Sequence, residues 1–313
     1  MGEQAAAFVL TQGAAGTQRV TGIGFIASVN RQGIGVWPQS TKAPYSTVRQ
    51  IDNCNFTNLY AGVWVSDSFG VTQNCTFTNC FYLTRMSGFH GQQTWTYAPI
   101  ATDSINFWFI QNCTGHVTGD ALICDGNDAQ PYCVRNNSFT FDSKAQCFPI
   151  FDAHGDYDGS TSSGIYGAIT TLIYGNTLTF QSGAQGYPLF DQRGGVALVF
   201  NNTVTGSGGS AEVRFREETY EFNGWKLPAS DVVNNTYVWN NTLNGTVDQP
   251  SVMTTASNSL APGVSATSVI KLNQQYWIVQ PTTLRLPPAD PYPSGTPAVT
   301  LPNAPGPASA ISP

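Results

Sequence analysis

A short phrase recurs along this chain and limits what it can fold into. Each copy joins an apolar run to a polar N-x-S/T corner and then to another apolar residue. The copies are QIDNCNFTN at 50–58, VTQNCTFTN at 71–79, FIQNCTG at 109–115, CVRNNSFTF at 133–141, LIYGNTLTF at 172–180, LVFNNTVTG at 198–206, YVWNNTLNG at 237–245 and a weaker RVTGIGFIA at 19–27. Aligned on the corner residue, the strong copies are 21, 38, 24, 39, 26 and 39 residues apart. A period of this length indicates a stacked repeat.

Each repeat unit reads as β-structure. Val, Ile, Thr, Phe and Tyr dominate, apolar and polar residues alternate, and Gly or Asn stands at the ends. Charged residues make up only 10% of the chain, and no segment shows a helical period with caps. The sequence therefore predicts an all-β parallel solenoid of about eight rungs. At roughly 4.8 Å per rung, the rod would be about 38 Å long.

The residue after each corner predicts how the interior is built. It is Cys in the early copies and Asn in the later ones: Cys54, Cys75, Cys113, Asn137, Asn176, Asn202 and Asn241. In most copies an apolar residue follows two positions later, so strand alternation points both inward. We expect a stack of thiols that continues as an asparagine ladder, in which each buried amide bonds to the next.

These features resemble the right-handed parallel β-helices of the pectate-lyase superfamily. The phrases RVTGIGF, GVTQNCTF, FDAHG, DQRGG and YVWNNT are similar to those of bacterial and phage β-helix repeat proteins, over about residues 19–245. The resemblance implies a right-handed parallel β-helix over 1–245 that is directed at polysaccharide. The superfamily includes lyases, hydrolases, epimerases, tailspikes and non-catalytic adhesins. The resemblance is therefore specific for the fold and much less specific for the chemistry.

The remaining chain and the overall charge limit where the protein could act and which partners it could bind. Residues 246–313 are rich in Pro, Ser and Thr and are expected to be extended, with 276–279 able to dock along the rod as an edge strand. The chain shows no apolar run long enough to span a membrane and no signal-peptide pattern. A net charge of −6 argues against nucleic acid or an anionic membrane as partner. We expect an extracellular, cell-surface or virion protein whose first rung is covered by an N-terminal partner or in a homo-oligomer.

Seven cysteines leave at least one thiol unpaired. Cys54, Cys75 and Cys113 belong to the predicted core stack. Cys124 and Cys133 flank a short loop and are the pair that we expect to be bridged in an exported protein. Zinc is not expected, because no C-x-x-C pair or suitably spaced His is present.

The alternating repeat lengths predict where chemistry would lie. Every second rung carries an insertion, at about 80–106, 142–169 and 207–233, each after the N-x-T strand. The insertions should leave the rod at one corner and form a wall beside a flat sheet, a surface suited to a long polymer.

The insertions and the DQRGG phrase hold unusual concentrations of charged and aromatic residues. The candidate catalytic residues are Asp152, His154, Asp156, Arg193, Arg216 and Glu217. The candidate substrate-binding residues are Arg85, His90, Trp95, Tyr97 and Trp225, and the candidate calcium ligands are Asp152, Asp156 and Asp158.

Two cleavage mechanisms fit these residues. A lyase would need a metal, Arg or Lys to neutralise a uronate carboxylate and a base for the adjacent C–H. The three aspartates could hold the calcium, with Arg193 or Arg216 near the position of the base. A hydrolase would use paired carboxylates. TDSI at 102–105, GDAL at 119–122 and AHG at 153–155 loosely resemble polygalacturonases, but Ala121 follows Asp120 where that family has a second aspartate, and no R-I-K follows the HG.

Each candidate also has a structural interpretation. The aspartates of 152–158 could form Asx-turns or hold a structural calcium, and Arg193 could form a buried pair with Asp191. The aromatic residues could cover the rod, and Glu217 could lie on a solvated loop. The sequence thus favours a glycan-cleaving β-helix, with a non-catalytic glycan-binding or structural protein as the alternative.

Overall fold

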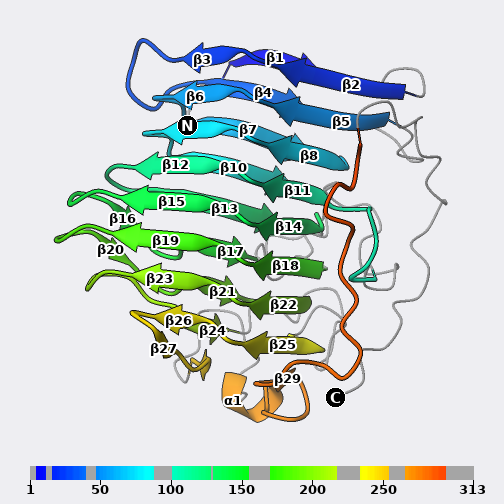
Figure 1. Ribbon diagram of the computed structural model, residues 1–313, viewed down its shortest axis with the longest axis vertical. Coiled ribbons are helices and arrows are strands. Elements are labelled where there is room, and N and C mark those ends of the chain that lie inside the picture. The colour runs from blue at the N-terminus through cyan, green and yellow to red at the C-terminus, as the bar shows by residue number, and fades with distance from the viewer. Residues whose placement is uncertain are drawn as a thin grey trace.

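The chain folds into a right-handed parallel β-helix with three long sheets around one core (Figure 1). This computed structural model describes residues 5–11, 16–39, 47–87, 101–127, 130–154, 170–216, 233–253 and 265–293. The chain passes through sheets A, B and C in turn, and one strand of each makes a rung. Successive rungs pair in parallel, which confirms the predicted solenoid.

The strands of the three sheets have the following bounds. Sheet A contains β1 (Ala6–Leu10), β4 (Ile34–Pro38), β7 (Ala61–Ser66), β10 (Tyr82–Ser87), β13 (Leu122–Asn127), β17 (Phe151–Ala153), β21 (Phe190–Gln192), β24 (Val213–Phe215) and β28 (Ser251–Val252). Sheet B contains β2 (Gly16–Thr21), β5 (Thr47–Asp52), β8 (Gly70–Gln73), β11 (Trp108–Gln111), β14 (Tyr132–Arg135), β18 (Thr170–Tyr174), β22 (Val196–Phe200), β25 (Thr236–Trp239) and β29 (Tyr276–Trp277). Sheet C contains β3 (Gly24–Ile26), β6 (Asn55–Thr57), β9 (Thr76–Thr78), β12 (Thr114–Val117), β15 (Ser138–Phe141), β19 (Thr177–Phe180), β23 (Thr203–Thr205), β26 (Thr242–Leu243) and β27 (Thr246–Val247).

The number of rungs follows the repeat count closely. Sheet C has eight parallel strands, one for each copy of the phrase, and β27 adds to it in antiparallel orientation. Sheets A and B have nine strands because β28 and β29 extend them beyond the last phrase. A small sheet pairs β16 (Gln146–Cys147) with β20 (Gln185–Gly186).

The corner residue of the phrase turns the chain from sheet B to sheet C. The corner asparagines have φ near +54° and Gly175 has φ +67°, in the left-handed region: Asn53, Asn74, Asn112, Asn136, Asn201 and Asn240. Asparagine and glycine adopt this conformation more readily than other residues. The backbone requirement of one turn therefore explains why the corner is always Asn or Gly.

The predicted asparagine ladder is confirmed. Asn137 Nδ2 donates to Asn176 Oδ1 (2.9 Å), Asn176 to Asn202 (2.9 Å) and Asn202 to Asn241 (2.8 Å). The second Nδ2 proton of each donates to a backbone carbonyl at 3.0 Å. At the start of the ladder the Cys113 backbone N–H donates to Asn137 Oδ1 (2.9 Å), so the thiol stack continues directly into the amides. Each buried amide group is thereby satisfied without water.

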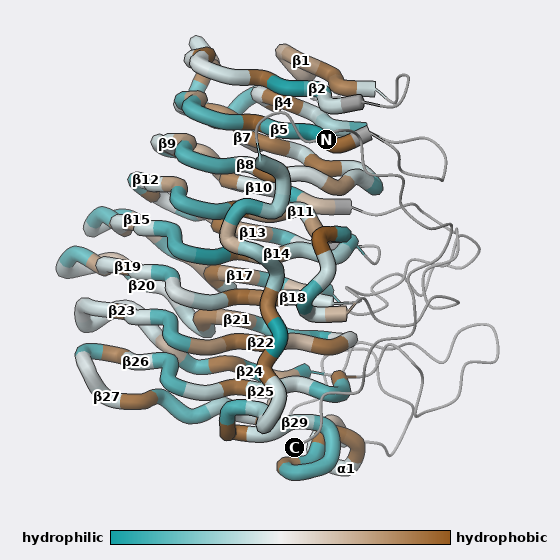
Figure 2. Tube along the Cα trace, turned by 45° about the vertical axis from the view of Figure 1, so that its right-hand side comes forward, coloured by the Kyte–Doolittle hydropathy of each residue, from teal (hydrophilic) through white to brown (hydrophobic). Residues whose placement is uncertain are grey.

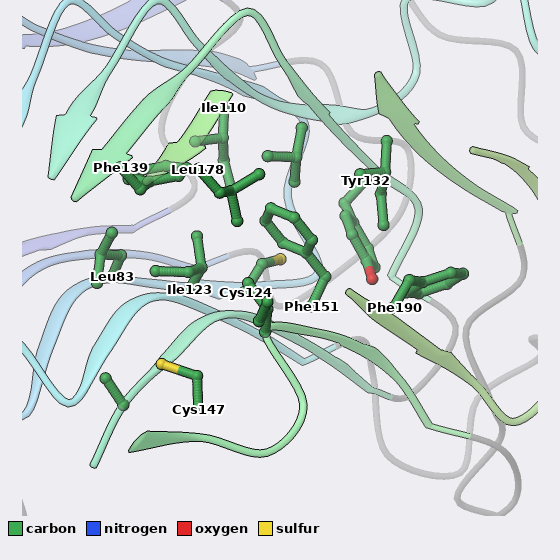
Figure 3. Packing of buried hydrophobic residues seen from close by; sticks show 14 of the residues in the cluster. Leu83, Ile110, Ile123, Cys124, Tyr132, Phe139, Cys147, Phe151, Leu178 and Phe190 are labelled. Atoms are coloured by element: carbon green, nitrogen blue, oxygen red, sulfur yellow. The ribbon is translucent and has the colours of Figure 1, made fainter. Parts of the chain in front are cut away.

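Like residues also stack in the apolar interior. Phe56 lies parallel to Phe25 and Phe77 at centroid distances of 5.1 and 5.0 Å. Farther along, the core passes through Phe139 and Leu178 (Figure 3). These side chains share one position of the repeat, which is apolar in every rung except that of Gly115, where the Phe139 ring lies against the glycine.

The predicted bridge between Cys124 and Cys133 is wrong. All seven cysteines are free and buried. Cys124 lies in the central core, whereas Cys133 belongs to a separate apolar cluster on the outer face of sheet B. The two thiols point to different sides of the rod wall, so the short loop in sequence does not bring them together.

The segment after β29 runs back along the outer face of sheet B (Figures 1 and 2). Arg135 of β14 donates to the carbonyls of Pro287, Pro288 and Ala289, and Gln50 of β5 donates to that of Tyr292 (2.7 Å). The segment covers the outer apolar cluster that includes Phe109, Leu172 and Phe200. In the part of the chain that the structure describes, the one helix, α1 (Ala266–Val269), has four residues and is too short to cross a membrane.

The insertions leave the rod later than the sequence suggested. Each expected range contains a sheet A strand in its first half, so the long connections run from β10 to β11, from β17 to β18 and from β24 to β25. All three therefore join sheet A to sheet B at the same corner. Their central residues, 88–100, 155–169 and 217–232, lie outside the described residues.

Candidate functional site

Three aspartates line up on the outer face of sheet A. Asp125 of β13 pairs in register with Asp152 of β17, which pairs with Asp191 of β21. Because their strands are hydrogen-bonded neighbours, adjacent members of the row are about 4.8 Å apart along the rod. The side chains of these aspartates are 6%, 2% and 0% exposed, although they point away from the core.

Arginines surround this row of carboxylates. Arg214 of β24 occupies the next position of the same row, and Arg85 of β10 the position before Asp125. Arg193 and Arg216 stand two residues after row positions, so strand alternation sends them to the same face. A carboxylate row of this density is tolerated because cations lie along one side and at both ends.

Asp191 is the most strongly held of the three carboxylates. It accepts from Arg214 Nε (3.0 Å) and Nη2 (2.8 Å), and it pairs with Arg216 Nη2 (2.8 Å). Arg193 Nε lies 3.4 Å away, which confirms the expected pairing of Arg193 with Asp191. The charge of Asp191 raises the pKa of Arg214 above its usual value, against the opposing effect of burial. Asp191 thus anchors three guanidinium groups and has little capacity left for substrate.

His154 connects the other two carboxylates. Its Nε2 lies 3.2 Å from Asp125 Oδ1 and 3.2 Å from Asp152 Oδ2. Its Nδ1 lies 2.9 Å from Arg193 Nη1, and Arg193 Nη2 donates to Asp152 Oδ2 at 2.7 Å. From within the core, the Tyr132 hydroxyl donates to the Asp152 backbone carbonyl (2.6 Å), which fixes the position of β17.

The electrostatic balance at Asp125 favours the ionised carboxylate. Burial alone would raise its pKa, but the hydrogen bond from His154, together with the charges of Arg85 and Arg193, lowers it below the usual value. Asp125 is therefore a carboxylate at neutral pH and can act as a proton acceptor.

One atom of the group remains available. Asp152 Oδ1 is buried and has no hydrogen-bond partner among the described residues. A buried carboxylate oxygen without a partner is unusual and is characteristic of sites that receive a ligand. One ligand atom from each of Asp125, Asp152 and His154 lies within 4.8 Å of the others, so their atom types and spacing would also suit a metal ion.

Partly exposed aromatic rings continue the same face toward the N-terminal rungs. Trp37 of β4 and Trp64 of β7 have ring centroids 5.6 Å apart, and Arg85 lies over Trp64 at 4.5 Å. Tyr60 lies 6.2 Å from Trp64 and 5.3 Å from Tyr82. Aromatic rings, a cation and carboxylates thus follow one another along sheet A.

The structure brings together only part of the predicted site. Asp152, His154, Arg193 and Arg216 lie in one cluster, and Arg85 lies at its edge. The other predicted residues fall outside the described residues, so their roles and the calcium site at Asp152, Asp156 and Asp158 remain predictions: Asp156, Asp158, Glu217, His90, Trp95, Tyr97 and Trp225. Of the aspartates in the polygalacturonase-like phrases, Asp103 pairs with Arg285 (3.7 Å) beside the C-terminal segment, and Asp120 accepts from Arg31 through its backbone carbonyl.

Sequence reasoning did not assign Asp125 to the site, although a signal was present. ICDGN at 123–127, IFDAH at 150–154 and LFDQR at 189–193 form a second repeated phrase with Asp at its centre. This phrase belongs to sheet A, whereas the N-x-T phrase belongs to sheets B and C. Aligning it would have placed Asp125 beside Asp152.

No family model, no curated protein and no solved structure matches this chain.

Proposed function

We propose that this protein binds a polysaccharide along the outer face of sheet A and cleaves it at the group formed by Asp125, Asp152 and His154. The setting would be extracellular, the cell surface or a virion. The observation that carries the proposal is the placement of two carboxylates and a histidine from adjacent rungs beside a line of partly exposed aromatic rings.

The rings support the choice of a glycan as ligand. Trp and Tyr faces offer flat apolar area with polar edges, which suits the C–H faces of sugar rings. Three of them lie on β4, β7 and β10 and Tyr60 directly precedes β7, next to the cluster on β13, β17 and β21. A polymer lying along sheet A would contact the rings and the carboxylates together.

The cluster supports acid–base cleavage. Paired carboxylates serve both glycoside hydrolysis and proton abstraction beside a uronate. Asp125 is ionised, and Asp152 has an oxygen without a partner among the described residues. Among the described residues, the row and its flanks hold four arginines, Arg85, Arg193, Arg214 and Arg216, against three aspartates, a balance that favours an acidic glycan.

The test is a depolymerisation screen over acidic and neutral polysaccharides that follows absorbance near 235 nm and reducing ends together. A lyase would raise both signals, and a hydrolase would raise reducing ends alone. We expect Asp152→Asn and Asp125→Asn to abolish the signal. Asp290→Asn, an exposed aspartate on the C-terminal segment, is the matched control and should retain full activity.

A non-catalytic glycan-binding protein is the second candidate. It is favoured by the deep burial of the carboxylates and by the saturation of Asp191 with arginine bonds, which are typical of a structural ion network. Binding without cleavage on every polysaccharide, with equal affinity in Asp152→Asn, would support this candidate and overturn the proposed cleavage.

A partner at the first rung is a separate proposal. Phe8, Val9 and Ile26 are 45%, 47% and 74% exposed on β1 and β3, the last strands of their sheets at this end of the described chain. Exposed apolar side chains on sheet edges favour association. Sedimentation of the wild type and of Ile26→Glu tests this, since loss of a dimer or larger species in the variant is expected.

A further inference from the structure

His154 has a defined hydrogen-bonding arrangement, because one of its ring nitrogens faces a group that can only donate. Arg193 Nη1 lies 2.9 Å from His154 Nδ1. A guanidinium has N–H donors and no acceptor, so Nδ1 must accept and carries no proton. The proton of the neutral ring is then on Nε2, which faces Asp125 Oδ1 and Asp152 Oδ2, both acceptors.

The same contact disfavours the two other states of the ring. An imidazolium would place an Nδ1 proton against the Arg193 donor and add a second cation there. A metal on Nε2 would require the Nδ1 proton of a neutral ligand histidine, which normally donates to a carboxylate or carbonyl. Among the described residues, charged groups of Asp125, Asp152 and Arg193 lie within 3.2 Å of the His154 ring, and Arg85 lies beyond Asp125.

We propose that Arg193 is a positioning residue that holds His154 as the neutral Nε2–H tautomer and thereby makes this group a proton-sharing site and not a metal site. His154 then donates a hydrogen bond to the carboxylates and leaves proton abstraction to an aspartate. This assignment adds a role for Arg193 to the proposed cleavage, and its relevance to catalysis rests on that proposed function. The tautomer itself follows from the contacts alone.

The first test is the nitrogen spectrum of the three histidines of the wild type, with His154→Gln used to assign the signal. We expect one protonated and one unprotonated ring nitrogen for His154 at neutral pH. An imidazolium at pH 7, or a neutral ring protonated on Nδ1, would overturn the proposal. This measurement uses the unmodified protein and does not depend on activity.

The second test asks whether removing the guanidinium changes what the ring can bind. Calorimetric titration with zinc, manganese or calcium should show no binding that depends on His154 in the wild type. Arg193→Gln, whose side-chain carbonyl can accept from Nδ1, should bind zinc about 10- to 100-fold more tightly. Tight wild-type zinc binding that His154→Gln abolishes would overturn the proposal.

Activity separates this inference from the proposed function. If the protein cleaves a glycan, His154→Gln, which keeps an N–H donor, should retain more kcat than Asp152→Asn. Equal and complete loss in both variants would contradict the donor role of His154. An inactive wild type whose His154 is the Nε2–H tautomer would refute cleavage while leaving the tautomer assignment supported.

Discussion

Asn202 donates from Nδ2 to Oδ1 of Asn241 in the next rung at 2.8 Å, and its own Oδ1 accepts the corresponding bond from Asn176 at 2.9 Å. The Oδ1 of Asn202 also accepts from the Asn176 backbone N–H. One side chain thus satisfies buried groups in the rungs on both sides.

Asn202→Ala is therefore expected to lower the free energy of unfolding by about 3 kcal/mol, since it leaves several buried donors and acceptors unpaired. Chemical denaturation measures this. Asn201→Gly is the control, because Asn201 is exposed and has φ +54°, a conformation that glycine adopts freely. The control should change stability by less than about 0.5 kcal/mol; an equal loss in both variants would contradict the ladder's role.

Arg135→Met is expected to detach the C-terminal segment. The buried guanidinium donates to Pro287, Pro288 and Ala289, so the variant should lose about 2–3 kcal/mol and expose 282–293 to hydrogen exchange. Arg285→Met removes an arginine that is 58% exposed and should leave exchange unchanged. Protection of 282–293 that survives in Arg135→Met would show that the apolar cluster alone holds the segment.

Acid should destabilise the protein through Asp125. Its pKa is lowered in the folded state, so the stability that it contributes is present above the unfolded value of about 4 and is lost as the pH falls through the folded pKa. We expect the difference in unfolding free energy between wild type and Asp125→Asn to shrink as the pH falls from 5 to 2. A difference that stays constant over this range would mean that Asp125 has no altered pKa.

Alkali should destabilise the protein through its buried thiols. Burial raises the pKa of Cys133 and Cys147 to about 12 each and that of Cys80 to about 11. The unfolded thiols ionise near 8.5, so above this pH each contributes a loss of about 1.4 kcal/mol per pH unit until its folded pKa is reached. The melting temperature should fall above about pH 9, and less steeply in Cys133→Ser.

A thiol reagent at pH 8 should modify cysteine only after unfolding, and rapid labelling of the folded protein would contradict this burial.

The fold could be predicted because its signal is repeated. Gly175, Asn201 and Asn240 occupy the corner position, whose turn requires Asn or Gly, so a single backbone constraint recurs and sets the register. The predicted bridge between Cys124 and Cys133 is wrong because no repeated signal gives the direction of these two side chains. Only their strand positions show that the two thiols point to different sides of the rod wall.

Only part of the candidate site could be predicted, because its residues come from separate rungs and become neighbours only through strand pairing in sheet A. Asp125 and Asp152 are 27 residues apart in sequence, a separation set by loops of irregular length, and become neighbours through the β13–β17 register. The contact between Arg193 and His154 depends on side-chain orientation at the ends of two strands. No local pattern encodes that orientation.

The bond from Gln50 to Tyr292, which joins positions 242 residues apart in sequence, changes how the rod should unfold. A solenoid held only by neighbouring rungs is a linear array that can fray from either end. The returning C-terminal segment links the second rung to the last, so opening either end must also break contacts with the other. We expect a single cooperative transition in which the two ends of the rod lose protection together.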